Sequence, residues 1–130
     1  MTPLSLILLY SLFRLKHFVC DYALQTNWIA LNKGLSGRQG WQALLLHTLG
    51  QAIGTTLVTV VFAPALWWLG LVDFAVHTAI DLCKARLTHK MGWTPKDRWF
   101  WLSIGLDQEA HNFTHLAYIV IIYVTLTGGL

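Results

Sequence analysis

The sequence predicts an all-α integral membrane protein, a bundle of four membrane-spanning helices in one domain over residues 1–130. Three observations favour this fold class. Of the 130 residues, 55% are hydrophobic and only 12% are charged, whereas a soluble domain carries roughly 25% charge. The stretches 41–72 and 113–130 contain no charged residue. Because a membrane helix needs about 20 mainly apolar residues, the chain has room for four spans with short connections and none for a separate soluble domain.

The first expected span covers residues 4–29. It is apolar but interrupted by charged and polar residues between positions 14 and 21, so hydropathy alone ranks it as a weak span. A polar connection with several glycines, residues 32–40, follows it.

The second and third expected spans cover residues 41–63 and 65–84. The uncharged run that they share is too long for one helix. Pro64 divides it, because proline lacks the N–H that a continuing helix would use. A second polar connection, which contains Pro95, leads to the fourth expected span, 99–124.

Positive charge is concentrated in the two polar connections, which hold seven of the nine Lys and Arg residues. By the positive-inside rule, both connections face the cytoplasm and both termini face the outside. The net charge of +3 is explained by this orientation, and we expect no nucleic-acid partner.

Each expected span carries polar residues three or four positions apart, which places them on one helix face. An ionisable side chain inside a span costs about 2.5–3.5 kcal/mol on insertion scales, so such residues usually face the bundle interior and have a task. At 1.5 Å of rise per residue, Asp21, His47, His77 and Asp107 all lie roughly 9–12 Å from the cytoplasmic ends of their spans. The four faces are therefore expected to converge on one pocket in the cytoplasmic half of the membrane.

The chain also contains an internal regularity. His17 and Asp21 form an H-x-x-x-D motif that recurs 60 residues later as His77 and Asp81. Two duplicated helical hairpins would explain this spacing. Chance is the other explanation, since the rest of the two halves aligns poorly.

Histidine and carboxylate one helical turn apart can bind the same metal ion. Imidazole combined with carboxylate suits zinc, iron or manganese, so the expected cofactor is a divalent metal of this kind. Two alternatives stay open, a proton or ion relay and a polar network that only holds the helices in register. The predicted ligands are His17, His47, His77, Asp81, Asp107 and His111. The predicted partners that hydrogen-bond these ligands are Gln25, Gln51 and Gln108.

Two smaller expectations concern side chains outside this pocket. Arg14 and Asp73 fall at similar depth in the outer half, so we expect an ion pair between them. Cys20 and Cys83 lie inside apolar stretches, so we expect packed free thiols and no disulfide.

The spaced motifs, taken together, resemble a known family. The motifs are His17-x-x-x-Asp21-x-x-x-Gln25, Leu-Leu-Leu-His47, His77-x-x-x-Asp81-x-x-Lys84 and Asp107-Gln108-x-x-His111. Their order is similar to that in a group of small bacterial and phage integral-membrane proteins of unknown function. The resemblance covers nearly the whole chain and implies a location in the bacterial inner membrane, but it implies no substrate or reaction. Arg14 and Lys16 depart from the pattern, in which apolar residues precede the first histidine.

The leading functional hypothesis is a metal-dependent hydrolase that acts on a membrane lipid such as a phospholipid or glycolipid. A metal would lower the pKa of bound water toward about 7, and Asp21 or Asp81 would accept the proton. Lys84 and Arg86 would hold an anionic headgroup. The alternatives are a small transporter or proton or metal-ion relay, and a non-catalytic membrane partner that assembles into a homo-oligomer. The polar faces thin out toward the outer half, which favours a one-sided pocket over a transporter.

Overall fold

The computed structural model describes residues 1–128, and within them the structure is all-helical, with no strand. Five α-helices are joined by short connections, one of which contains a 3-10 helix, η2, and α1 continues into a π-helix, η1. In chain order the elements are α1 (Pro3–Phe18), η1 (Val19–Ala23), α2 (Asn27–Asn32), α3 (Arg38–Phe62), η2 (Pro64–Leu66), α4 (Leu69–Met91) and α5 (Arg98–Thr127).

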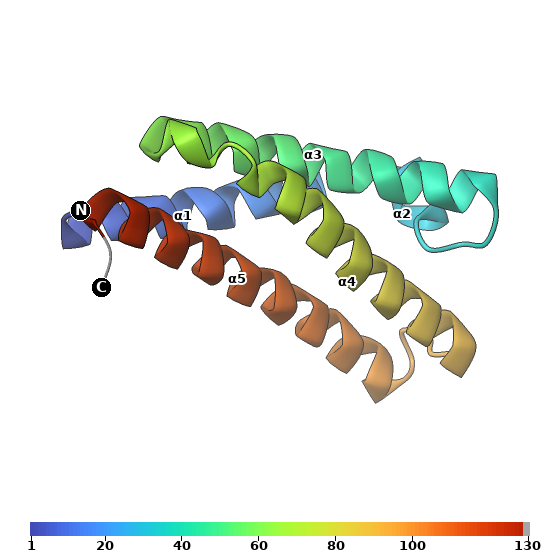
Figure 1. Cartoon of the computed structure of the whole chain (residues 1–130). Coiled ribbons are helices and arrows are strands. Elements are labelled where there is room, and N and C mark those ends of the chain that lie inside the picture. The colour runs from blue at the N-terminus through green and yellow to red at the C-terminus, as the bar shows by residue number, and fades with distance from the viewer. Residues whose placement is uncertain (129–130) are drawn as a thin grey trace.

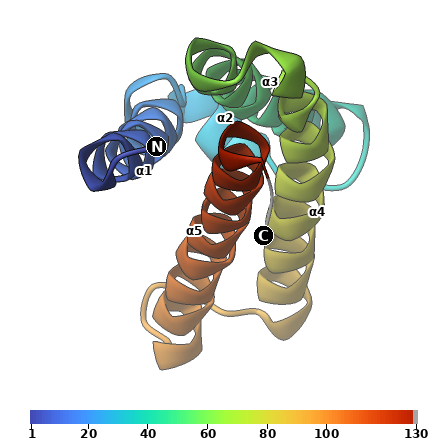
Figure 2. The ribbon, with the colours of Figure 1, turned by 60° about the vertical axis from the view of Figure 1, so that its left-hand side comes forward.

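The chain runs back and forth, so that α1 begins and α5 ends at one end of the molecule, here called the terminal end (Figure 1). The turn with η2 lies at the same end. Residues 33–37 and 92–97, which connect α2 to α3 and α4 to α5, form the opposite end, the loop end. α3 packs most closely against α4, and α1 contacts both α3 and α5. α4 and α5 lean away from α3 toward the loop end, so the bundle is splayed there (Figure 2).

The surface is apolar and the interior is polar, the reverse of a soluble protein. Leu4 and Phe113 are exposed on outer helix faces, whereas histidines, aspartates and threonines are buried. Within residues 1–128 three segments are long and apolar enough to cross a membrane, namely Pro3–Ala23, Arg38–Phe62 and Pro64–Met91. Both observations are consistent with a membrane location.

α5 is the longest helix, with 30 residues, but it falls outside this set. Its middle turns carry Asp107, Glu109 and His111, which lower its mean hydropathy. Just before α5, Thr94 donates its backbone N–H and its hydroxyl to Asp97 Oδ2, each at 2.8 Å. These hydrogen bonds lower the pKa of Asp97 and close the loop from which α5 begins.

The single span expected over residues 4–29 is interrupted in the structure. The helix continues past Phe18 as a π-helix only to Ala23, and the chain then turns before α2. Thr26 caps α2 by accepting a hydrogen bond from the Ile29 N–H at 3.2 Å, which fixes a new helix start. α2 therefore packs against α3 and does not prolong α1.

The other helices follow the expected ranges more closely. α3 and α5 begin and end within three residues of the ranges 41–63 and 99–124. α4 continues past position 84 to Met91, where Gly92 ends the helix in the left-handed conformation at φ 65°.

An apolar cluster, the terminal core, closes the terminal end. It is built by α1, the η2 turn, α4 and α5, and its members are Leu9, Phe13, Ala63, Leu66, Leu69, Tyr118, Ile119 and Ile122. All of these residues are buried. The terminal core separates the polar interior from the terminal end.

Gly70 allows α4 to approach α3 closely. A side-chain carbon at this position would overlap the Thr56 side chain and lie 2.9 Å from the carbonyl oxygen of Ala52. We predict that Gly70→Ala destabilises the protein by about 1–3 kcal/mol, because the two helices must move apart. Unfolding of the detergent-solubilised protein, followed by circular dichroism, measures the change.

Gly105→Ala is the matched control for this prediction. Nothing lies within 4 Å of a side-chain carbon built at Gly105, and alanine favours a helix over glycine by about 0.8–1 kcal/mol. The control variant should therefore be as stable as the natural chain or more so. Equal stability of the two variants would contradict the close approach at Gly70.

Candidate metal centre

Polar side chains from all four long helices meet inside the bundle. Asp21 lies at the edge of this group, with its side chain 12% exposed. The buried members are His17 on α1, His47 on α3, His77 and Asp81 on α4, and Asp107 and His111 on α5. These six residues and Asp21 are called the polar centre below.

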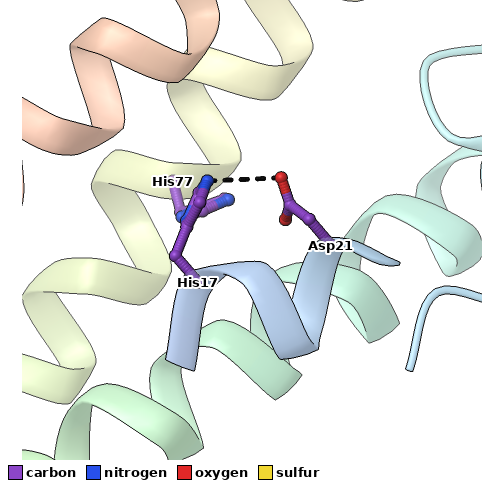
Figure 3. Close-up of side chains that lie close together, drawn as sticks. All are labelled: His17, Asp21 and His77. Carbon is purple, nitrogen blue, oxygen red and sulfur yellow. Dashed lines mark ion pairs between the residues drawn. The ribbon is translucent and has the colours of Figure 1, made fainter. Parts of the chain in front are cut away.

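Asp21 belongs to the π-helix η1, which continues α1. A π-helix bonds each N–H to the carbonyl five residues back, as Leu24 does to Val19 at 2.9 Å. Such short π segments are frequent at functional sites. Here Asp21 Oδ2 lies 3.2 Å from His17 Nε2, and His77 of α4 lies beside the pair (Figure 3).

Asp81 contacts three histidines of the polar centre, more than either of the other two aspartates does. Its Oδ2 lies 3.3 Å from His47 Nε2, and its Oδ1 lies 3.2 Å from His111 Nε2. His77 Nε2 is 3.9 Å from the same Oδ1. The two oxygens of one carboxylate thus face histidines on two different helices, which is the arrangement that a carboxylate shared between two ligand groups requires.

Three overlapping groups in the polar centre have the composition of metal sites. Within each group one ligand atom per residue lies within 4.8 Å of the others. The groups are His17, Asp21 and His77; His47, His77 and Asp81; and Asp81, Asp107 and His111. His77 and Asp81 each belong to two groups, so the three groups overlap at these two residues. Nitrogen and carboxylate donors of this kind suit zinc, iron or manganese.

Several donor atoms of the polar centre are buried without a hydrogen-bond partner among the described residues. His17 Nδ1, both ring nitrogens of His77 and Asp107 Oδ1 are in this position, whereas His17 Nε2 is paired with Asp21. A buried polar atom left unpaired costs about 1–3 kcal/mol. A neutral imidazole has one free lone pair, which a metal ion can accept. The unpaired atoms therefore fit a bound metal better than a network that exists only to hold helices together.

Two lysines approach the carboxylates from the loop end. Lys33 Nζ lies 3.4 Å from Asp81 Oδ2 and 3.3 Å from His47 Nε2. Lys84 Nζ lies 3.5 Å from Asp107 Oδ2. With the histidines counted as neutral, the three aspartates of the polar centre and the two ammonium groups leave one formal negative charge, which a bound cation would balance.

The predicted hydrogen-bond partners differ in their positions. Gln51 donates to Asp21 Oδ1 at 2.6 Å, and Gln108 donates to Asp21 Oδ2 at 3.2 Å. Gln25 makes no such contact, and its Oε1 is buried without a hydrogen-bond partner in the described structure. The turn after η1 removes Gln25 from the helical register that the sequence predicts.

Lys84 and Arg86 do not lie together. Being two positions apart on α4, they point to different sides of the helix. Lys84 faces Asp107, whereas the Arg86 guanidinium lies 6.0 Å from the centre of the Trp41 ring. The two side chains line different cavities, so the expected pairing around one headgroup is not what the structure shows.

Lys16 is a buried residue whose position the sequence did not predict. Its Nζ donates to Gln51 Oε1 at 2.9 Å and to Asp73 Oδ2 at 3.3 Å, and it lies 3.3 Å from His115 Nε2. The expected pairing of Arg14 with Asp73 is therefore wrong. Lys16 pairs with Asp73 instead of Arg14, and its hydrogen bond to Gln51 Oε1 orients the Gln51 amide toward Asp21.

One sequence signal could have identified Lys16. Gly54 lies on the facing side of α3, and a side-chain carbon there would overlap the Lys16 chain. A glycine opposite a lysine inside two apolar spans indicates that the lysine passes between the helices. No comparable signal marks Lys33, which follows the short helix α2 in a connection.

A cavity of about 620 Å³ reaches the polar centre from the loop end. Its polar lining includes Lys33, Asp81, Lys84 and Thr88. We call it the loop-end cavity. It is the route by which water and a polar group could approach Asp81.

We predict that Gln51→Leu weakens metal binding about 10–100-fold, as loss of a residue that orients a ligand typically does. The reason is that Gln51 connects Lys16 to Asp21, whose Oδ1 lies 3.4 Å from Nε2 of the predicted ligand His47. Titration of metal-free protein with zinc, followed by calorimetry, measures the affinity. Gln25→Leu is the matched control and should leave the affinity unchanged. An equal effect of the two substitutions would refute the role assigned to Gln51.

Comparison with known proteins gives a family but no function. A family model described as a protein of unknown function, DUF3307, matches residues 7–129. The chain therefore belongs to the DUF3307 family. No curated protein and no solved structure matches it.

Proposed function

We propose that this member of a family without assigned function is a metal-dependent hydrolase with its site inside the membrane. The observation that carries the proposal is the convergence of three His and Asp groups on His77 and Asp81, in a buried space where the ring nitrogens of His77 make no hydrogen bond within the described structure. The substrate is a lipid-like molecule, because the site lies between helices whose outer faces are apolar.

The proposed arrangement has four membrane spans in the bacterial inner membrane, with α5 as the fourth. The outer face of α5 supports this, since Leu106 and Val120 are both exposed along its length. The loop end faces the cytoplasm, because it carries most of the positive charge. The polar centre then opens toward the cytoplasm through the loop-end cavity.

We also propose that the two halves derive from a duplicated hairpin, with α1 and α3 equivalent to α4 and α5. Equivalent contacts support this. Gln51 of α3 contacts Asp21 Oδ1 at 2.6 Å, and His111 of α5, 60 positions later, lies 3.2 Å from Asp81 Oδ1. In each half the aspartate meets a residue 30 positions further along the chain.

The proposed chemistry follows from the different positions of two carboxylates, Asp21 and Asp81. His47, His77, Asp81, Asp107 and His111 would hold the divalent metal, zinc, iron or manganese. The metal would supply Lewis-acid activation of a water molecule. Asp21 lies at the edge of the centre and is held by Gln51 and Gln108, so it is placed to accept a proton from that water. Asp81 is shared by two ligand groups and serves as a ligand.

The terminal core favours an enzyme over a transporter. A transporter must connect its site to both faces of the membrane in turn. Here the side toward the terminal end is packed with Leu9, Phe13 and Ile122, each fully buried. Between this core and the polar centre lies the Lys16–Asp73 pair, which is itself buried.

The decisive test of this proposal is metal content and its link to activity. Protein purified without chelators and reloaded with zinc, iron or manganese should hold stoichiometric metal, measured by elemental analysis. His77→Ala and Asp81→Asn should lose it, because each removes a ligand from two groups. The metal-loaded protein should release a water-soluble product from vesicles of bacterial polar lipid, and EDTA should stop the release.

His89→Ala is the control for these variants. His89 is exposed at the loop end, where it lines the loop-end cavity, and it belongs to none of the three ligand groups among the described residues, so metal content should be unchanged. Size-exclusion chromatography shows whether the ligand variants remain folded. Absence of bound metal in folded natural protein would overturn the proposal.

The orientation has its own test. We predict that single cysteines at Ser36 and Thr94 label from the cytoplasmic side and that one at Thr2 labels from the outside, in a background without Cys20 and Cys83. A membrane-impermeant maleimide applied to intact cells and to inverted vesicles makes the measurement. Labelling of Ser36 and Thr2 from the same side would contradict the proposed topology. Leu130, the natural site for a C-terminal probe, lies outside the described residues.

A further inference from the structure

We propose that the substrate is a lipid phosphate, a long apolar chain that ends in a phosphate group. The chain would lie in a groove between α4 and α5, and the phosphate would be held by Lys33 and Lys84. This inference rests on the proposed hydrolase function and names the substrate class of the same site.

The groove runs along the outer side of α4 and α5 and has a volume of about 560 Å³. Most of its lining is apolar and exposed, including Cys83, Leu87, Leu102 and Leu106. α4 is part of a segment apolar enough to cross a membrane, so the groove opens to lipid. An apolar groove at this position fits an acyl or isoprenoid chain that enters sideways from the bilayer.

The inner edge of the groove is polar. Lys84 and Asp107 line it there, with their charged atoms 3.5 Å apart. Lys84 also lines the loop-end cavity, and so does Trp93, so the groove and the cavity adjoin at these two residues. The Lys84–Asp107 ion pair forms the partition between them.

One of the three ligand groups lies at this junction. Asp81 lines the loop-end cavity, Asp107 lines the groove, and His111 completes their group. A lipid whose chain follows the groove inward therefore brings the first polar atoms of its head to the ligand group. Hydrolysis there would break the bond from phosphorus to the chain oxygen and form one from phosphorus to the water oxygen. It would release inorganic phosphate and a long-chain alcohol, whose oxygen takes up the proton that Asp21 accepted from the water.

The charges at the junction favour phosphate over a neutral sugar head. Lys33 and Lys84 both line the loop-end cavity, and each contacts an aspartate of the polar centre. Each ammonium group has three N–H donors, so both lysines keep donors for a phosphate dianion beyond their contacts with the aspartates, with or without a metal ion on Asp81 and Asp107.

Cys83 provides a direct reporter of this binding. It is exposed and lines the groove, whereas the other cysteine, Cys20, is buried. In metal-free protein, where no hydrolysis occurs, we expect tetradecyl phosphate to slow alkylation of Cys83 by N-ethylmaleimide. At about ten times its Kd, the lipid should slow the reaction about tenfold. Intact mass spectrometry follows the rate.

Two further ligands separate the contributions of chain and head. Tetradecanol has the chain without the phosphate, and inorganic phosphate has the charge without the chain, so both should protect Cys83 much more weakly. Lys84→Gln should reduce the protection by tetradecyl phosphate to that given by tetradecanol. A cysteine introduced at Val61, which is exposed on α3 away from the groove, controls for general shielding by lipid and should not respond.

The outcomes distinguish this inference from the proposed function. Equal protection by tetradecanol and tetradecyl phosphate would overturn the phosphate site, and no protection by either would overturn the groove as the chain site. Protection that depends on Lys84 in a protein that never holds metal would sustain the lipid site and refute the hydrolase.

Discussion

The carboxylate of Asp81 holds four parts of the molecule together. Lys33 approaches it from the connection after α2, His47 from α3 and His111 from α5, while Asp81 itself belongs to α4. A charge inside a membrane protein is costly unless it is paired, so these contacts constrain how the helices pack. The splay of α4 and α5 toward the loop end leaves room for the cavity that reaches this carboxylate. The fold and the candidate site therefore depend on the same few polar contacts.

The polarity of the interior changes along the bundle axis. Apolar side chains fill the terminal end, the buried Lys16–Asp73 pair follows, and the polar centre lies beyond it toward the loops. Lys16 and Asp73 are formally neutral as a pair, and Thr55 donates a hydrogen bond to Asp73 at 2.7 Å. Of the three aspartates in the polar centre, Asp81 lines the loop-end cavity. This change in polarity along the bundle axis explains why the polar centre opens toward the loop end, although all four long helices contribute to it.

Helical periodicity was sufficient to predict that six of the side chains in the polar centre lie together, and their binding of a metal stays a prediction. His77 and Asp81 are one turn apart, so a helix must place them on the same face. The polar residues of the other spans lie at the same distance from the cytoplasmic ends, so they were expected at the same depth in the membrane. Periodicity failed where the helix is irregular. A π-helix inserts an extra residue into one turn, and nothing in the sequence around Asp21 announces it, so Gln25 was placed wrongly. Long side chains were the second difficulty. The position of Lys33 depends on tertiary space that no local pattern records, and Gly54 is the sequence feature that marks the space for Lys16.

The contact between Gly54 and Lys16 has a consequence for the family's evolution. The lysine chain occupies the volume that any larger residue at position 54 would need. A lineage that acquires a bulky residue at position 54 must therefore lose Lys16 as well, and Asp73 would then be left as an uncompensated charge. Positions 16, 54 and 73 should consequently change as a set among relatives, so that homologues divide into those with this buried ion pair and those with an apolar layer in its place.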